Sequence, residues 1–136
     1  TVNQPVEQLR RVVDAYRSNG GTGRVAVQVH VSYASDDDTA LAIAHDQWRT
    51  NVVGPPFSWD CDSVEAFDAV GERVRPEDVR GTVLVSSDPS QHVAWLRELI
   101  DVGFDMVQLH HVGTEQDEFI DVFGERVLPE LEVTRP

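Results

Sequence analysis

Lysine is absent from this 136-residue chain, and cysteine and methionine each occur only once. All 11 basic residues are arginines, set against 24 acidic residues, which gives a formal net charge of −13. A charge of this sign and size opposes binding to nucleic acid or to an anionic membrane surface. No apolar run is long enough to cross a bilayer. We therefore expect neither nucleic acid nor a membrane as a partner.

The single cysteine and the first residue of the chain suggest where the protein resides and whether it has been processed. The single cysteine, Cys61, excludes an internal disulfide and fits a reducing cytoplasm, so we expect a cytoplasmic protein. Nothing resembles a signal peptide. A length of 136 residues suits one domain, over residues 1–136. The chain opens at Thr1 and its only methionine is Met106, so we expect that an upstream segment has been removed.

Apolar residues recur at helical spacing in some segments and at strand spacing in others. Helical spacing over residues 5–19 predicts a first helix, ended by the glycines that follow. Valines at every second position over residues 24–33 predict a strand, with Gln28, His30 and Ser32 on its other side. Strands are also expected over residues 81–87 and 105–111, and helices after Ser35, Ser63, Asp88 and Thr114. Strands alternating with helices predict an α/β fold with a parallel sheet.

Several finer expectations follow from the same patterns. Gly103 is expected to stop a helix and Pro129 to end the last one. Residues 50–62 read as a long loop, which is usually functional or covers another part of the protein. Trp48 and Trp95 fit the outer helical layer, whereas Trp59, inside that loop, is a candidate lid over a pocket. The buried helical stripes are expected to include Val12, Tyr16, Ile120 and Leu128.

Polar residues gather at the ends of the three predicted strands. Parallel strands bring their carboxyl ends to one rim, where ligands bind in α/β proteins. Glutamine and histidine suit the polar edge of a ring, serine suits a phosphate oxygen, and amides at helix starts suit an anion. Each residue taken singly has an alternative interpretation as a satisfied interior polar group. The predicted ligand contacts are Gln28, His30, Ser32, Ser86, Ser87, Gln108, His110, Gly113 and Thr114.

Other chemistry finds little support in the sequence. There is no glycine-rich phosphate loop, no zinc-binding spacing and no nucleophile elbow. His110 and His111 are adjacent on a predicted strand, so they point to opposite faces and cannot both bind one metal. We expect no metal site, and the sequence identifies no catalytic residue.

Several segments resemble the C-terminal part of luciferase-like flavin- or deazaflavin-dependent oxidoreductases, in particular a probable non-deazaflavin flavin branch. The segment from Gly103 through Leu-His-His-Val-Gly to Phe119 carries most of the resemblance, which runs nearly end to end. The supporting segments are residues 27–34, 42–51, 75–79, 85–88 and 119–131.

The resemblance implies a (β/α)8 TIM barrel of the bacterial luciferase-like type, of which this chain would supply about three βα units. It implies hydride transfer to or from a small organic substrate, with FMN or a deazaflavin coenzyme in the barrel mouth. Such barrels need about 250 residues, so the early strands have no counterpart here. Catalytic residues therefore cannot be assigned from the resemblance.

Two hypotheses follow from these observations. The chain is either the C-terminal portion of an oxidoreductase, inactive alone, or a stand-alone partial barrel that binds or assembles without catalysis. Three strands leave exposed sheet edges, which are a liability in isolation. Either hypothesis predicts a partner, namely the missing N-terminal barrel portion or a second copy of the chain.

Overall fold

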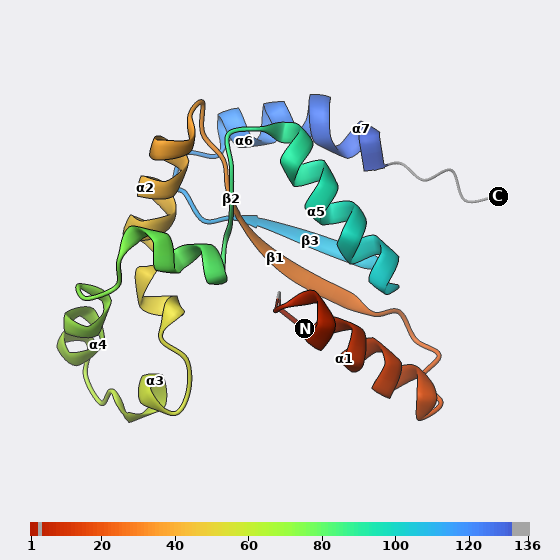
Figure 1. Ribbon diagram of the computed structural model, residues 1–136, viewed down its shortest axis with the longest axis horizontal. Coiled ribbons are helices and arrows are strands. Elements are labelled where there is room, and N and C mark those ends of the chain that lie inside the picture. The colour runs from red at the N-terminus through yellow and green to blue at the C-terminus, as the bar shows by residue number, and fades with distance from the viewer. Residues whose placement is uncertain (3, 132–136) are drawn as a thin grey trace.

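A three-stranded parallel sheet lies at the centre of the molecule (Figure 1). The computed structural model describes residues 1–2 and 4–131. The strands are β1 (Ala26–Ser32), β2 (Leu84–Val85) and β3 (Met106–His111). The longest pairing joins β1 to β3, from Ala26 opposite Met106 to Val31 opposite His111. The predicted α/β class and the first and third strands are confirmed.

The second strand is shorter than the predicted range 81–87. Only Leu84 and Val85 pair with β1, opposite Val31 and Ser32. The Ser86 N–H still donates to the Ser32 carbonyl of β1, but the two donors after it bind elsewhere. The Ser87 N–H donates to the Asp37 carboxylate and the Asp88 N–H donates to the Ser86 hydroxyl, so pairing ends there. Farther back along β1, the same edge is taken by Val2, which bridges to Gln28.

The valine side of β1 faces the larger apolar core. Val27, Val29 and Val31 are fully buried there against α1 (Val6–Ser18) and α5 (Pro89–Val102). Burying one such side chain contributes about 1.5–3 kcal/mol. The same core is closed by a continuous helical segment formed by α6 (Asp117–Val122), the π-helical turn η3 (Phe123–Val127) and α7 (Leu128–Leu131).

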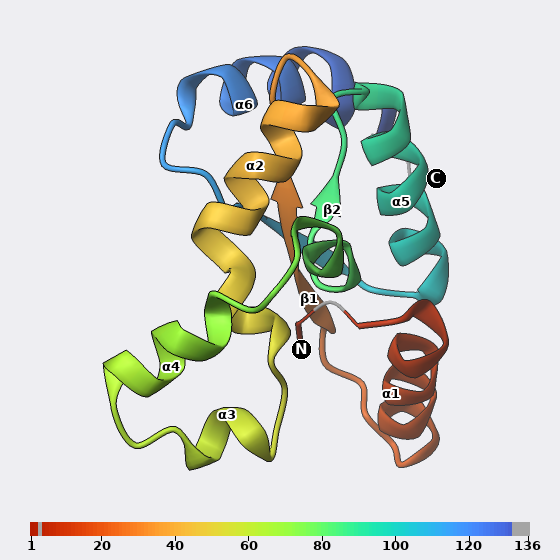
Figure 2. The same ribbon diagram turned by 60° about the vertical axis from the view of Figure 1, so that its left-hand side comes forward.

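A second, smaller core lies on the other face of the sheet. Two of its buried alanines come from α2 (Asp37–Trp48) and a third, Ala34, from the connection before that helix. Its buried valines come from the segment that runs from the 3-10 helix η2 (Pro76–Gly81) into β2 and from the residue after β3. The segment between these helices contains the 3-10 helix η1 (Arg49–Val52), α3 (Phe57–Asp60) and α4 (Val64–Gly71). The helices α3 and α4 form an arm that extends from the body (Figure 2). The predicted loop over residues 50–62 is therefore partly helical.

The strand order β2-β1-β3 explains why helices cover both faces. The chain passes from β1 to β2 in one direction and from β2 back past β1 to β3 in the other. Right-handed crossovers in opposite directions place their helices on opposite faces of a sheet, as seen for α2 and α5. The adjacent strands β1 and β3 therefore send their chains to opposite sides of the sheet, which opens a crevice beyond their carboxyl ends.

Helix ends agree with the sequence at three positions and differ at two. Ser63 and Asp88 cap α4 and α5, and Gly103 ends α5 with a left-handed φ of 105°. The cap of α2 is Asp36, which accepts from the Thr39 N–H, and not Ser35 as predicted. The predicted capping box at Thr114 is absent, because α6 begins after Gln116, whose side chain instead donates to the Gly113 carbonyl.

Some predicted core positions lie at the surface. Val12, Tyr16, Ile120 and Leu128 are 45%, 41%, 59% and 48% exposed, so these parts of the predicted stripes were wrong. The cause is tertiary, since burial of a helical stripe depends on which parts of it other elements cover. Pro129 lies inside α7 instead of ending the helix. The turn directly before α7 is π-helical, with hydrogen bonds between residues five apart, and the proline has no N–H to donate to the preceding turn. Residues 132–136, for which the sequence pattern predicts no helix or strand, lie outside the described residues.

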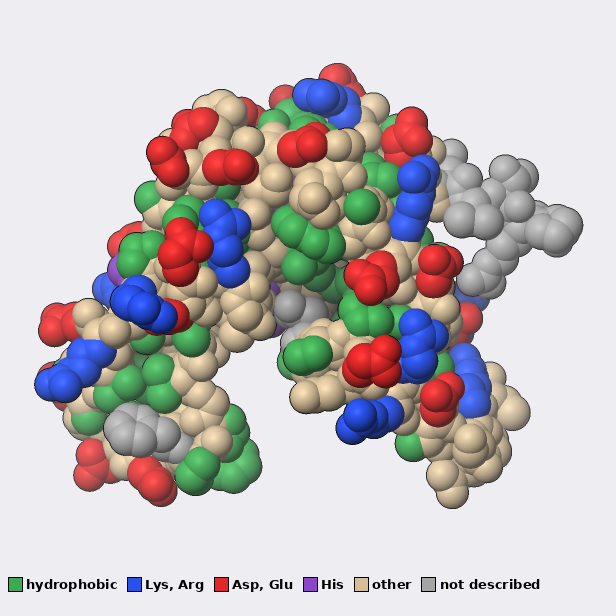
Figure 3. All heavy atoms as spheres, viewed as in Figure 1, with side chains coloured by type: hydrophobic (Ala, Val, Ile, Leu, Met, Phe, Trp, Pro, Cys, Tyr) green, Lys and Arg blue, Asp and Glu red, His purple; other side chains and the backbone are tan. Residues whose placement is uncertain are grey.

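Charged side chains cover much of the surface. Figure 3 shows acidic and arginine side chains interspersed over one face, with acidic groups numerous where α2 and α6 lie. The same face is hollowed between the α3–α4 arm and α1. Among the described residues, no helix combines the length and apolarity that a membrane span requires.

Candidate functional site

A polar cluster formed by Gln28, His30 and His110 occupies the sheet face opposite the larger core. The Gln28 amide nitrogen lies 3.3 Å from Nδ1 of His110 and 3.5 Å from Nε2 of His30. The two imidazole rings meet edge to face, with centroids 5.4 Å apart. All three side chains are half-buried. Strand alternation and the β1–β3 register therefore bring together three of the predicted ligand contacts.

The indole ring of Trp48 packs on this cluster. Its centroid lies 4.5 Å from that of His30 and 5.2 Å from that of His110. Trp48 adjoins the second core, as predicted for an outer helical residue, but its contacts with the two histidines were not predicted. The signal available in the sequence was its place at the end of α2, which folds back along β1. We call these four residues, Gln28, Trp48, His30 and His110, the histidine cluster.

Burial keeps His30 neutral near physiological pH. It lowers the pKa of His30 below the usual value, and the neighbouring His110 lowers it further, while a hydrogen bond with the Thr82 backbone acts in the opposite direction. A neutral imidazole carries one donor and one acceptor nitrogen. His30 therefore offers hydrogen-bonding groups and a flat ring surface without a formal charge.

Gln108 lies on the same strand face but outside the histidine cluster. It is exposed, and its amide makes only a weak contact of 3.7 Å with the sulfur of Met106. Its predicted role as a ligand contact stays a prediction.

The three predicted serines are used within the chain. The buried Ser32 hydroxyl donates to the Ala40 carbonyl at 2.7 Å and thereby ties β1 to α2. The Ser86 hydroxyl accepts from the Asp88 N–H, and the Ser87 N–H donates to Asp37. Because Asp88 also caps α5, the expected anion-binding amides are occupied by carboxylates of the same chain. The three serines therefore serve contacts within the chain in this structure.

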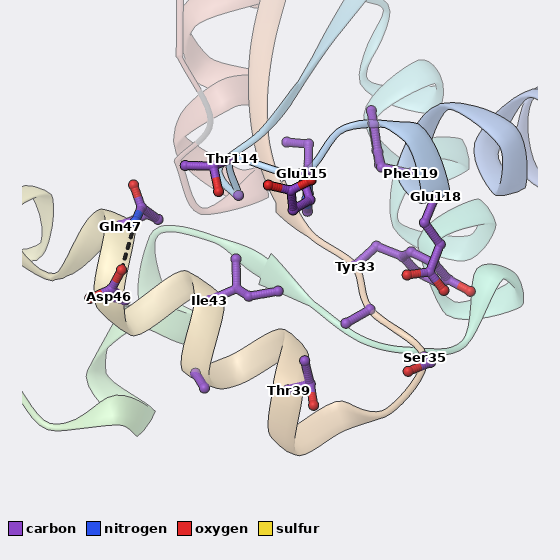
Figure 4. A pocket seen from close by; sticks show the side chains of 14 residues that line it. Tyr33, Ser35, Thr39, Ile43, Asp46, Gln47, Thr114, Glu115, Glu118 and Phe119 are labelled. Atoms are coloured by element: carbon purple, nitrogen blue, oxygen red, sulfur yellow. Dashed lines mark hydrogen bonds between the residues drawn. The ribbon is translucent and has the colours of Figure 1, made fainter.

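Gly113 and Thr114 line a cavity of about 440 Å³ in the crevice between β1 and β3. Its walls come from the β1–α2 connection, from α2 and from the loop that leads from β3 into α6 (Figure 4). We call it the rim cavity. In Figure 4, Ile43 and Thr39 project from α2 on one side, and Glu115 and Phe119 lie on the other. The remaining lining residues are Tyr33, Ala34, Ser35, Ala42, Asp46, Gln47, His111, Gly113, Thr114 and Glu118.

The rim cavity is acidic. Asp46, Glu115 and Glu118 line it, and no arginine is among the lining residues that the structure describes. Asp46 forms an ion pair of 3.5 Å with Arg49 beside the cavity. A phosphate group placed here would meet carboxylates, contrary to the expectation of an anion site at this rim.

His111 forms part of the rim cavity lining and was expected only as the residue facing away from His110. It is 5% exposed and stacks on Phe119, with ring centroids 4.8 Å apart. Burial lowers its pKa, so the ring is neutral near physiological pH. Its Nδ1 has no hydrogen-bond partner in the part of the chain that the structure describes.

Other candidates lie elsewhere or are structural. Trp59 is 79% exposed and does not line the rim cavity, so no lid is formed by it in this structure. His92, which sequence reasoning missed, is fully buried, and its Nε2 lies 2.9 Å from the Ser86 carbonyl. No group of three metal-ligating side chains occurs among the described residues.

Comparison with known proteins places the chain beside coenzyme F420-dependent enzymes. No protein-family model matches it. It is 27% identical over 129 residues to an F420-dependent glucose-6-phosphate dehydrogenase of Microbacterium testaceum, covering 92% of this chain and 38% of that protein. It is 34% identical over 105 residues to the enzyme of the same name from Intrasporangium calvum, covering 77% and 31%.

Solved structures agree in fold. An F420-dependent secondary alcohol dehydrogenase, in complex with an F420-acetone adduct, superposes with a TM-score of 0.78 at 16% identity, over 98% of this chain and 42% of that one. The F420-dependent tetrahydromethanopterin reductase of Methanopyrus kandleri gives 0.69 at 16% identity, over 95% and 43%. The chain thus spans less than half the length of each of these four proteins, and the predicted partial-barrel fold class is confirmed.

Proposed function

We propose, from the premise that the chain belongs to the luciferase-like oxidoreductase family, that it forms one wall of a deazaflavin site in a hydride-transferring enzyme. Residues 1–136 are then a single partial domain, the C-terminal segment of the barrel. Relatives named as F420-dependent support a deazaflavin in preference to FMN. The remaining barrel strands would come from the rest of the polypeptide.

The observation that carries this proposal is the histidine cluster. It lies on the sheet face opposite the valine side, which packs on α1 and α5 as the outer side of barrel strands packs on helices. On the cluster's own face, the end of α2 contributes Trp48. The flat rings of Trp48, His30 and His110 suit contact with a planar tricyclic ring. The amide of Gln28 and the imidazole nitrogens of the two histidines can hydrogen-bond the polar edge of such a ring. The residues present therefore fit the ring portion of the coenzyme.

A deazaflavin, when bound, supplies two-electron hydride transfer. The chain's own contribution is binding and orientation. Gln28 holds the His110 ring in place, and Trp48 shields both histidines from water. Because His30 stays neutral, no positive charge on that ring would repel a cationic substrate or attract an anion into the wall. The substrate itself is a small organic molecule in this proposal.

A coenzyme titration tests the proposal. The natural gene product that contains this chain is titrated with coenzyme F420 and, separately, with FMN, and binding is followed by the change in ligand fluorescence. We expect saturable binding of F420, and a dissociation constant roughly tenfold higher in His110→Ala, from loss of one hydrogen-bonded ring contact. Gln91→Ala, at an exposed position on α5, serves as the matched control.

The outcomes separate the alternatives. Tighter binding of FMN than of F420 would replace the deazaflavin by a flavin. Binding of neither would favour the non-catalytic binding or assembly module. Equal losses in His110→Ala and Gln91→Ala would contradict the assignment of the histidine cluster as the coenzyme wall.

A further inference from the structure

The rim cavity has the size and position of a ligand site separate from the histidine cluster. Its volume of about 440 Å³ falls within the usual range for small-molecule pockets, about 300–1,000 Å³. It lies where β1 and β3 send their chains to opposite faces of the sheet, the place at which α/β sheets bind ligands. None of its lining residues belongs to the histidine cluster.

The residues that line the rim cavity favour a positively charged ligand. Carboxylates of Glu115 and Glu118 come from the loop and helix after β3, and Asp46 comes from α2, so two elements supply negative charge to one cavity. Between these groups lie the aromatic rings of Tyr33 and Phe119 and the aliphatic side chain of Ile43. Carboxylates beside aromatic faces favour an organic cation with an apolar body, and they oppose an anion.

His111 adds an independent observation. Its side chain lies in the cavity lining and only 5% of its surface is exposed. Its Nδ1 has no hydrogen-bond partner among the described residues. A buried polar atom without a partner is rare and calls for an explanation. A neutral imidazole nitrogen accepts a hydrogen bond, and an ammonium group has only donors to offer. The same ligand class therefore satisfies the carboxylates and the histidine.

The absence of a side chain at Gly113 leaves space between the loop after β3 and two other residues that line the rim cavity. A Cβ at this position would lie 2.6 Å from Nε2 of His111 and 2.9 Å from the Ile43 side chain. Both neighbours are themselves lining residues, so the absence of a side chain at Gly113 brings the loop close to the histidine. A side chain at position 113 would thus crowd two residues that line the cavity.

We propose that the rim cavity binds a small organic amine in its ammonium form and rejects phosphorylated molecules of the same shape. The ammonium group lies beside Glu115 and Glu118, with the apolar body against Phe119 and Ile43. The relatives named as glucose-6-phosphate dehydrogenases act by their names on a phosphorylated sugar, whereas the carboxylates that line the rim cavity of this chain oppose a phosphate group. The inference concerns binding alone and does not depend on the coenzyme.

Three probes that share one ring test the charge selection. Benzylamine, benzyl alcohol and benzyl phosphate are titrated into the natural gene product, and backbone amide NMR shifts of Gly113 and Thr114 report binding. We expect benzylamine to bind at least roughly fivefold more tightly than benzyl alcohol, from two or more partly exposed ion pairs. Benzyl phosphate should cause no shift at these amides. Equal binding of the amine and the alcohol, or a response to the phosphate, would overturn the proposal, as would the absence of any binding.

Two variants separate the rim cavity from general attraction to an acidic protein. The double variant Glu115→Gln and Glu118→Gln should weaken benzylamine binding by roughly fivefold. The double variant Glu7→Gln and Glu98→Gln removes the same charge from exposed positions on α1 and α5 outside the cavity, and should leave it unchanged. An equal loss in both would show that only net charge matters.

A third variant changes the shape of the cavity without changing its charge. Ala42→Phe, at an exposed lining position on α2, should fill part of the cavity and also weaken benzylamine binding. Undiminished binding in Ala42→Phe would place the amine elsewhere on the protein. Because Ala42 is exposed, this variant tests the site even if a glutamine variant folds poorly.

Discussion

The side-chain amide of Gln28 lies 3.3 Å from Nδ1 of His110, across the β1–β3 pair. The two residues stand 82 positions apart in the sequence and become direct neighbours only through the parallel register. The hydrogen bond to Gln28 and the packing of Trp48 together hold the His110 ring in one orientation. The histidine cluster is therefore an arrangement that one substitution can loosen.

Gln28→Ala should weaken coenzyme binding in the proposed enzyme. Removal of the amide frees the His110 ring and leaves one of its nitrogens without this partner, so we expect the F420 dissociation constant to rise roughly tenfold. Fluorescence titration measures the affinity, and nitrogen NMR shifts of His110 report the loss of the hydrogen bond. Unchanged affinity together with changed His110 shifts would show that ring orientation does not matter for binding.

Ser32→Ala should lower stability and spare ligand binding. The buried Ser32 hydroxyl donates to the Ala40 carbonyl, so its loss should cost about 1 kcal/mol in the free energy of unfolding. Denaturant unfolding measures this change, with Ser18→Ala at the exposed end of α1 as the control. A loss of F420 affinity at unchanged stability would instead restore Ser32 as a ligand contact.

Stability should decrease as the pH falls below about 6.5. Burial lowers the pKa of His30, His92 and His111, so the folded protein binds fewer protons than the unfolded chain in this range. Stability is then fully present above the unfolded value of about 6.5 and is lost progressively below it. Unfolding measured at pH 8, 7, 6 and 5.5 tests the expected decline.

His92→Leu isolates one part of that pH dependence. The replacement removes a fully buried imidazole, so the decline between pH 7 and 5.5 should become shallower, even if loss of the contact with Ser86 lowers stability at pH 8. An equally steep decline in the variant would assign the effect to other groups.

Gly113→Ala should destabilise the protein, in contrast to Gly124→Ala. The new Cβ at position 113 would crowd His111 and Ile43, a steric conflict that typically costs about 1–3 kcal/mol. At Gly124 a Cβ meets nothing within 4 Å, and a helical alanine is favoured over glycine by roughly 0.5–1 kcal/mol. Thermal and denaturant unfolding of the two variants should therefore shift in opposite directions.

Local patterns sufficed for much of the fold. The alternation around Val27, Val29 and Val31 predicted a strand with one apolar side, and the structure buries that side completely. Ser63, Asp88 and Gly103 end their helices as expected, because capping depends on the few residues next to each cap. The candidate residues Gln28, His30 and His110 could likewise be found from strand parity alone.

The hydrogen bonds of the three candidate serines depend on partners that the sequence did not indicate. Ser32, Ser86 and Ser87 were predicted to face a ligand, but their hydrogen bonds go to Ala40, Asp88 and Asp37. A hydroxyl or an amide at a strand end looks the same in the sequence whether its partner is a ligand or a neighbouring helix. The ligand roles of Gln108 and Thr114 remain predictions.

The sequence by itself determined the first and third strands, most of the helices, the acidic character of the surface and the apolar side of β1, because these follow from near neighbours and composition. The tertiary structure alone decided that β1 lies between β2 and β3, that Trp48 covers the two histidines, and that carboxylates of α2 and α6 meet around one cavity. These relationships depend on the direction of each crossover, which is set by packing between segments far apart in the chain.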